Sequence, residues 1–171
     1  MRAALAFAAV LLLAACEGPE EPAPGASETA APVLGEQKLS LQTADFPVLA
    51  SKDCVEVVQF YLEAIGGREW DKAALVWDDP VVDAARLEAV FTGYETPQVE
   101  WTEPSVEGAA GSLYCSASGT LTDAGNPARP PGEGQLVLRR VNDVPGATPD
   151  QRRWTLQSST FVETLERSKR G

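Results

Sequence analysis

The fold is organised around one amphipathic stretch, Asp53-Cys54-Val55-Glu56-Val57-Val58-Gln59-Phe60-Tyr61-Leu62-Glu63-Ala64-Ile65-Gly66-Gly67. Its apolar residues recur at steps of three and four, which is the spacing of a helix with one buried face. Asp53 and Glu56 have the spacing of a capping box, which favours a helix start here. Gly66 and Gly67 suit the left-handed position that often follows a helix. The residues expected on the buried face are Cys54, Val57, Val58, Tyr61, Leu62 and Ile65.

Two shorter helices are expected next. Residues 70–77 place two tryptophans and two alanines on one face. The run Asp78-Asp79-Pro80 then ends this helix and starts another, because aspartate caps a helix and proline suits its first position. With Asp83 nearby, these carboxylates also have the composition of a calcium site, but a helix stop and cap is the simpler interpretation. The third helix ends at Gly93, and its apolar face is Leu87, Val90 and Phe91.

From residue 96 onward the apolar period changes from helical to alternating, which predicts strands. Helices followed by consecutive strands predict an α+β domain over residues 51–162, with an antiparallel sheet and the helices on one face. Residues 163–171 are polar and predict a flexible tail. The four expected strands are 98–102, 113–118, 136–141 and 153–162.

The chain opens with Met1-Arg2 and an apolar run over residues 3–14 that is too short to span a bilayer as a helix. The residues Leu13-Ala14-Ala15-Cys16 resemble the lipobox of bacterial lipoprotein precursors. The resemblance implies a signal peptide over residues 1–15, cleavage before Cys16, and acyl chains such as palmitate on Cys16 that anchor the protein in a membrane. Glu17 is not the aspartate that this family uses for inner-membrane retention, so the expected location is the outer membrane, facing the periplasm.

Residues 16–50 are rich in proline, alanine and glutamate and have no periodic apolar face, which predicts a disordered tether behind the lipidated Cys16. Its one apolar segment, residues 46–49, is expected to pack onto the domain as a lead-in. The alternative is that the tether is a docking segment for another envelope protein.

Two cysteines remain besides Cys16, namely Cys54 and Cys115. Disulfides form and persist in the cell envelope outside the cytoplasm, so we expect these two to pair. The bond would hold the first helix on the sheet and place Leu113, Cys115 and Ala117 on the inner face. Two buried free thiols are the alternative.

Charge and composition exclude several kinds of function. The formal net charge is −11, which is the wrong sign for a nucleic-acid binder and for attraction to anionic lipid headgroups. We therefore expect the protein to contact the membrane only through its acyl chains. The chain has no histidine, and therefore no Ser-His-Asp or Cys-His nucleophile. It also lacks a zinc signature and a glycine-rich phosphate loop. No metal, cofactor or catalytic residue is predicted.

The stretches Val57–Ile65 and Arg68–Ala74, a hydrophobic helix followed by a glycine turn and an aromatic-Asp-x-Ala-Ala helix, resemble the opening of nuclear transport factor 2-like domains. The resemblance implies a cone in which N-terminal helices pack on a curved four-stranded antiparallel sheet, often around a pocket. Residues 138–146 also look like part of an uncharacterised family of envelope lipoproteins. Enzymes with this cone use a pocket carboxylate and a tyrosine or second acid. Here the donors would be Tyr61, Tyr94 or Tyr114, and the base Asp143 or Glu100.

Arg140 is the most informative candidate, because alternation in its strand puts it beside core positions. It is either a rim arginine paired to a carboxylate or an anchor for an anionic ligand. The expected function is a non-catalytic module that binds a small ligand or an envelope protein. The alternatives are a small isomerase, cyclase or dehydratase, and an acidic interaction or inhibitor module; a homodimer stays open. The candidate pocket residues are Tyr61, Trp77, Trp101, Tyr114, Arg140 and Trp154.

Overall fold

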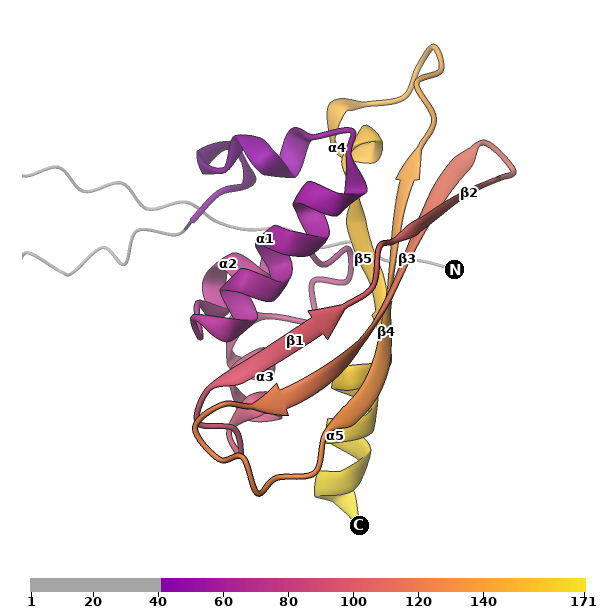
Figure 1. Cartoon of the computed structure of the whole chain (residues 1–171). Coiled ribbons are helices and arrows are strands. Elements are labelled where there is room, and N and C mark those ends of the chain that lie inside the picture. The colour runs from indigo at the N-terminus through magenta and orange to yellow at the C-terminus, as the bar shows by residue number, and fades with distance from the viewer. Residues whose placement is uncertain (1–40) are drawn as a thin grey trace, which may run out of the picture. The chain divides into compact units, whose positions relative to one another are not determined.

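The computed structural model describes residues 41–171, in which helices pack against an antiparallel sheet, so the predicted α+β class is confirmed (Figure 1). The expected signal peptide, the lipidated Cys16 and most of the tether lie outside the described residues. The helices are α1 (Cys54–Gly66), α2 (Trp70–Ala74), α3 (Ala84–Phe91), α4 (Pro149–Arg152) and α5 (Thr160–Arg170), with short 3-10 turns η1 (Thr43–Asp45) and η2 (Pro47–Ala50) before them. The strands are β1 (Pro97–Trp101), β2 (Ser105–Ala109), β3 (Ser112–Asp123), β4 (Gly132–Val141) and β5 (Thr155–Ser159).

The sheet has five strands in the described region, so the prediction of four is wrong. The strand order is β1-β3-β4-β5, and β2 also pairs with β3. β1 lies beside one half of β3 and β2 beside the other, as Pro97 is opposite Asp123 and Ala109 is opposite Ser112. The two strands are therefore successive parts of one sheet edge, interrupted near Pro104, which has no N–H to donate.

β2 escaped prediction because all five of its residues are exposed, so it has no alternating pattern. A two-residue turn at Ala110 and Gly111 connects it to β3, and both residues have positive φ, 46° and 82°. Such turns match the twist of paired strands.

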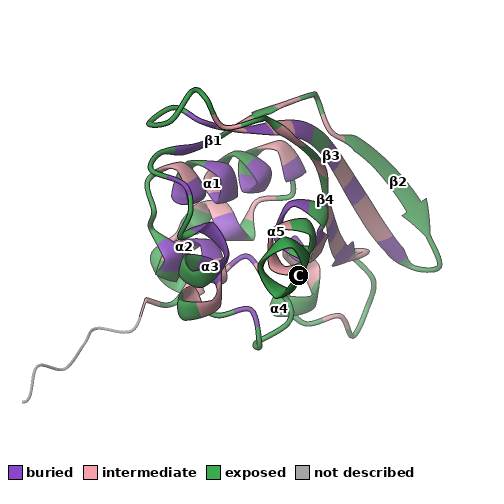
Figure 2. Cartoon of the chain, turned by 90° about the horizontal axis from the view of Figure 1, so that it is seen from below, coloured by how far each residue is buried: buried purple, intermediate pink, exposed green. Residues whose placement is uncertain are grey.

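The helices cover one face of the sheet, and the buried residues gather between the two layers (Figure 2). In α1 all six residues predicted on the buried face are buried, and Asp53 caps the helix by accepting a hydrogen bond from the Val55 N–H (2.9 Å). The predicted left-handed glycine is wrong, because Arg68, with φ of 57°, takes that conformation. The predicted disulfide between Cys54 and Cys115 is confirmed, with the Cα atoms 6.4 Å apart.

α2 and α3 are shorter than predicted. Asp83, not Asp79, caps α3 by accepting from the Arg86 N–H (2.8 Å), while Asp79 accepts from the Val81 N–H (2.9 Å) in the turn before it. The chain after α2 forms a parallel bridge between Trp77 and Leu156, which covers the outer edge of β5.

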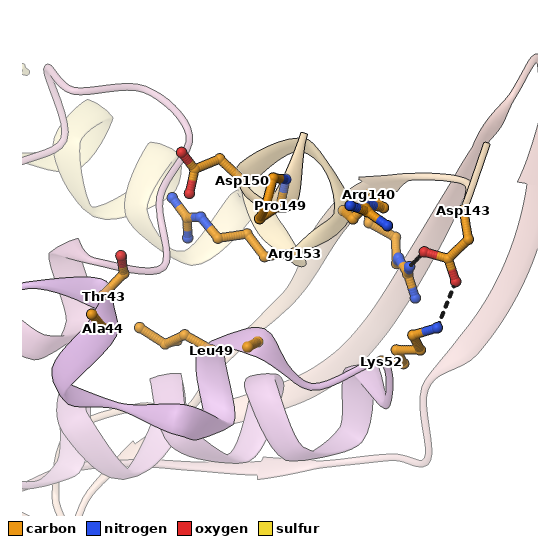
Figure 3. Close-up of a pocket in the computed structure, with 11 residues that line it drawn as sticks. Thr43, Ala44, Leu49, Lys52, Arg140, Asp143, Pro149, Asp150 and Arg153 are labelled. Atoms are coloured by element: carbon orange, nitrogen blue, oxygen red, sulfur yellow. Dashed lines mark hydrogen bonds and ion pairs between the residues drawn. The ribbon is translucent and has the colours of Figure 1, made fainter. Parts of the chain in front are cut away.

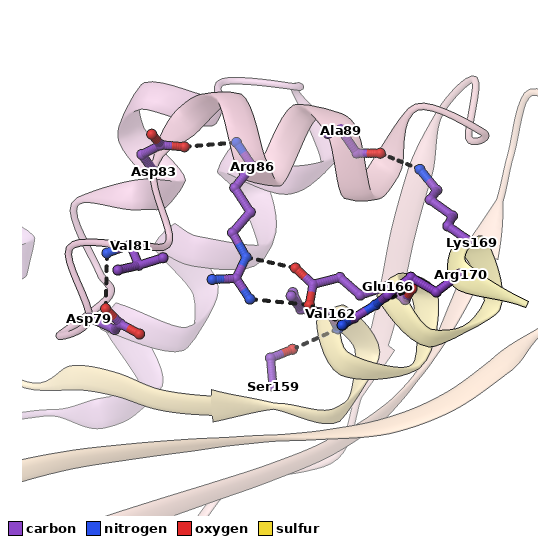
Figure 4. A network of polar contacts seen from close by, with 10 residues as sticks. All are labelled: Asp79, Val81, Asp83, Arg86, Ala89, Ser159, Val162, Glu166, Lys169 and Arg170. Carbon is purple, nitrogen blue, oxygen red and sulfur yellow. Dashed lines mark hydrogen bonds and ion pairs between the residues drawn. The ribbon is translucent and has the colours of Figure 1, made fainter.

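The C-terminal residues form a helix, α5, so the predicted fourth strand stops at Ser159 and the tail after it is not frayed. Ser159 caps α5 through the Val162 N–H (3.4 Å), and a two-bond pair between Arg86 and Glu166 holds α5 against α3 (Figure 4). The Phe161 ring packs on Gly134 of β4, where a Cβ would lie 2.5 Å from the ring.

Folded structure starts earlier than residue 51. The expected lead-in is present: Leu49 is 1% exposed and the Phe46 ring lies 5.3 Å from that of Phe60 on α1. Residues 43–50, predicted as the end of the tether, therefore belong to the folded domain. The described residues lie within one compact unit, Leu39–Gly171, that contains its own core.

Candidate functional site

A cavity of about 330 Å³ opens between residues 43–52, which precede α1, the end of β4 with the loop after it, and α4 (Figure 3). We call residues 43–50 the lead-in and this cavity the lead-in cavity. Its far wall depends on the loop that leaves β4, where Gly146 has a φ of 90° and Thr148 caps α4 through the Gln151 N–H (3.3 Å). The lining residues are Thr43, Ala44, Leu49, Ala50, Lys52, Arg140, Asp143, Pro149, Asp150, Arg152 and Arg153.

Arg140 lies at the base of this cavity and is only 4% exposed. Its Nη2 donates to Asp143 Oδ1 (2.7 Å), and its guanidinium carbon lies 5.9 Å from the ring centre of Trp154. Trp154 is itself fixed, because its indole N–H donates to the Lys52 carbonyl (3.0 Å). The arginine is thus both paired to a carboxylate and stacked on an aromatic ring, which limits its freedom to move.

The Arg140 Nε–H is buried and has no hydrogen-bond partner among the described residues. A buried unpaired donor costs about 1–3 kcal/mol, more when it is charged. An arginine offers five donors and no acceptor, so a second anion can bind without displacing the first. The cavity is therefore lined by a cationic group, one of whose buried donors is not paired by any described residue.

Asp143 is shared between two cations. Its Oδ2 accepts from Lys52 Nζ (2.7 Å) while Oδ1 accepts from Arg140. The Lys52 hydrogen bond, together with the charge of Arg140, holds the pKa of Asp143 below its usual value despite some desolvation. Asp143 therefore stays ionised at neutral pH and neutralises only part of the positive charge around it.

The cavity is locally basic in an acidic protein. Its lining carries four cationic side chains against two carboxylates, although the formal net charge of the chain is −11. The cations are Lys52, Arg140, Arg152 and Arg153, and the carboxylates are Asp143 and Asp150.

Tyr61 and Trp77 lie in the core, not at this cavity. Their rings meet edge to face, 6.4 Å apart. The Tyr61 hydroxyl and the Trp77 Nε1 have no hydrogen-bond partner within residues 41–171. Burial raises the pKa of Tyr61, and the neighbouring Trp77 offsets this only in part. A neutral, enclosed tyrosine of this kind packs the core.

Trp101 and Tyr114 are elsewhere again. Trp101 lines an open groove between α1 and β1, and Tyr114 is half-buried in β3, opposite Arg139 of β4 and Glu107 of β2. Of the six predicted pocket residues, only Arg140 lines this cavity, and Trp154 packs against its guanidinium. Sequence reasoning missed the lead-in wall, Lys52 and the Arg152-Arg153 pair.

The described residues offer little for acid–base chemistry. Among them, no cluster of three or more His, Cys, Asp or Glu side chains could hold a metal ion. The carboxylates there with a displaced pKa, which are Asp123, Asp143 and Glu166, are all lowered. At Asp123 desolvation alone would raise the pKa, but three backbone N–H donors and Arg129 outweigh it.

Within residues 41–171, no helix combines the length and the apolar character needed to cross a bilayer.

Comparison with known proteins does not place the chain in a family. No family model matches it, and no curated protein matches it. The structure of Bdellovibrio bacteriovorus Bd1075 is 10% identical, with a TM-score of 0.44, over 63% of this chain and 38% of that one. The structure of Aln2 from a Streptomyces species is 20% identical, with a TM-score of 0.43, over 62% of this chain and 86% of that one. TM-scores and sequence identities this low support no conclusion about fold or function.

Proposed function

We propose that this protein is a bacterial envelope lipoprotein, anchored by acyl chains on Cys16, whose nuclear transport factor 2-like cone binds a small ligand without catalysis. The ligand site is the lead-in cavity. The observation that carries the proposal is the buried Arg140 at the base of a cavity of about 330 Å³. Ligand sites of proteins start at about this volume and combine apolar walls with a few placed polar groups.

The anchor is supported by the residues Leu13-Ala14-Ala15-Cys16 behind a short apolar run. Several acyl chains make a stable anchor, whereas one gives only marginal residence. An acidic chain has no electrostatic attraction to anionic headgroups, so the anchor alone would hold it at the outer membrane, facing the periplasm.

The non-catalytic role is supported by the chemistry of the cavity. Its ionisable side chains are lysine, arginine and aspartate, and the chain has no histidine. Asp143, the carboxylate paired with Arg140, is held as an anion by Lys52 and Arg140 and so is a poor proton donor or acceptor near neutral pH.

Two mass measurements test the proposal. The intact mass of the protein from detergent-extracted envelopes should show cleavage before Cys16 and added acyl chains. A mass that still includes residues 1–15 would contradict the proposed anchor. Native mass spectrometry of residues 17–171, exported to the periplasm by a cleavable signal, should show a small adduct. Ala44→Trp, which adds a large side chain to the cavity lining, should weaken or abolish the adduct, whereas Ala109→Trp, at an exposed site on β2, should not. The absence of an adduct, or one that Ala44→Trp leaves unchanged, contradicts binding in the lead-in cavity.

A further inference from the structure

We propose that the lead-in cavity binds an amphipathic anion, whose carboxylate or phosphate head sits on the Arg140 guanidinium and whose short apolar chain lies against the lead-in. The inference rests on the proposed function, and it adds the chemical class of the ligand.

The head group follows from the Arg140 guanidinium, which lines the cavity. Its Nη2 donates to Asp143, and its buried Nε–H has no partner in the part of the chain that the structure describes. Hydrogen bonds between a guanidinium and a carboxylate or phosphate are among the strong ones in proteins. Trp154 packs against the guanidinium, so little ordering is needed when the ligand arrives.

The sign of the ligand's charge follows from the lining. Four cationic side chains face two carboxylates, so an anion gains from the local excess. The Lys52 side chain is 74% exposed at the rim, where it can attract an anion from solution. A cationic ligand would face this excess and would have only Asp143 and Asp150 as partners.

The apolar part follows from the carbon surface of the lining. Ala44 and Ala50 supply it from the lead-in and Pro149 from α4. A volume of about 330 Å³ lies at the lower end of the range for small-ligand sites. Octanoate, a small molecule with an apolar chain and one carboxylate, combines the two features of the lining.

Asp143 acts as an internal competitor of the ligand. Its carboxylate contacts both Arg140 and Lys52 at 2.7 Å, as a bound anion would. Removing one like charge about 4 Å away is worth about 1 kcal/mol in water, or a fivefold change in affinity. Asp143→Asn should therefore tighten binding of an anion by about fivefold, although it deletes a charged cavity residue.

Isothermal titration calorimetry of residues 17–171, which contain the whole compact unit, tests the inference with defined probes. Octanoate and hexyl phosphate present the two head groups, and octanol and octylammonium are the neutral and cationic controls. We expect octanoate or hexyl phosphate to bind at least tenfold tighter than either control. Arg140→Lys should weaken that binding at least tenfold, because lysine lacks the planar fork. Glu107→Gln, the same charge change as Asp143→Asn at an exposed site on β2, should leave it unchanged.

Several results would overturn the inference. If octanol binds as tightly as octanoate, the cavity is a purely apolar site. If octylammonium binds more tightly than octanoate, the preferred ligand is a cation and not an anion. Either result leaves the proposed function intact. Equal affinity in Asp143→Asn and in the unchanged chain would also contradict it, and that variant keeps the test valid if Arg140→Lys fails to fold. If no probe binds while the native adduct persists, the anionic class is wrong but the cavity is a site; if the adduct is also absent, both proposals fail.

Discussion

Breaking the bond between Cys54 and Cys115 should cost the domain about 4 kcal/mol of its free energy of unfolding. The two residues are separated by 61 positions, and the chain-entropy model gives about 4 kcal/mol for closing a loop of this length. Folded domains are stable by only about 5–15 kcal/mol, so the loss is a large part of the total. The bond joins the start of α1 to β3, and it therefore ties the helical layer to the sheet.

Packing adds a smaller term. Cys54 is 3% and Cys115 0% exposed. Replacing either by alanine removes a buried sulfur, and by analogy with a methyl group this costs roughly 1 kcal/mol. Reduction of the unchanged chain breaks the bond and keeps both sulfurs, so it isolates the cross-link from the packing.

Urea unfolding of residues 17–171, followed by tryptophan fluorescence, measures both terms. We expect reduction to lower the free energy of unfolding by about 4 kcal/mol, and Cys54→Ala alone to lower it nearly as much as the double alanine variant. Either single change breaks the same bond, so the two losses cannot add. Oxidised and reduced protein unfolding at the same urea concentration, or single losses that sum to the double, would refute the reasoning.

Three further predictions concern the layers around the site. Gly134→Val should lower the free energy of unfolding, measured by urea unfolding, by about 1–3 kcal/mol, because even a Cβ at this position would overlap the Phe161 ring. The pKa of Asp123 is lowered on folding, so its contribution to stability is present above its unfolded pKa near 3.9 and is lost as pH falls through the lower folded value. Asp123→Asn should therefore lower the urea midpoint at pH 7 and flatten its dependence on pH below about 4. Arg86→Ala should cost about 1 kcal/mol, since its pair with Glu166 is only partly buried.

Each of these has a matched control. Gly132→Val, on the same strand but with open space around it, should have little effect, and equal losses at the two glycines would contradict the contact with Phe161. Glu107→Gln should leave the dependence of the urea midpoint on pH unchanged. If it flattens this dependence below about pH 4 as much as Asp123→Asn does, the acid sensitivity of the domain does not come from Asp123. A coupling energy near zero between Arg86→Ala and Glu166→Gln would show that the pair adds nothing measurable.

The elements that could be predicted from sequence are those with one buried face. Residues such as Val57, Val58 and Ile65 are at most 1% exposed, so the helical period of α1 is plain in the chain. The disulfide was predicted from the two cysteines that remain besides Cys16 and from the expected compartment, without knowledge of geometry. The strand β2 gave no signal, because none of its residues is buried. α5 was mistaken for the end of a strand because Thr160, Phe161 and Val162 are residues that strands favour.

The site was harder to predict than the fold. Alternation in β4 singled out Arg140, but nothing local in the sequence places residues 43–52 and residues 149–153 around one cavity. That arrangement depends on the lead-in burying Leu49 and on the turn before α4, both of which are tertiary features. The other aromatic candidates proved to be core or surface residues, since burial of tryptophan and tyrosine does not reveal whether a cavity lies beside them.

The state of the Arg140 Nε–H tests the central claim most directly. In a proton–nitrogen correlation spectrum of residues 17–171, this signal should move and saturate as octanoate is added, because the carboxylate binds the guanidinium to which the Nε–H belongs. The Nε–H signal of Arg129, which lies beside Asp123 and outside the cavity lining, should stay in place. An Arg140 signal that does not respond to octanoate or hexyl phosphate would contradict an anion site in the lead-in cavity.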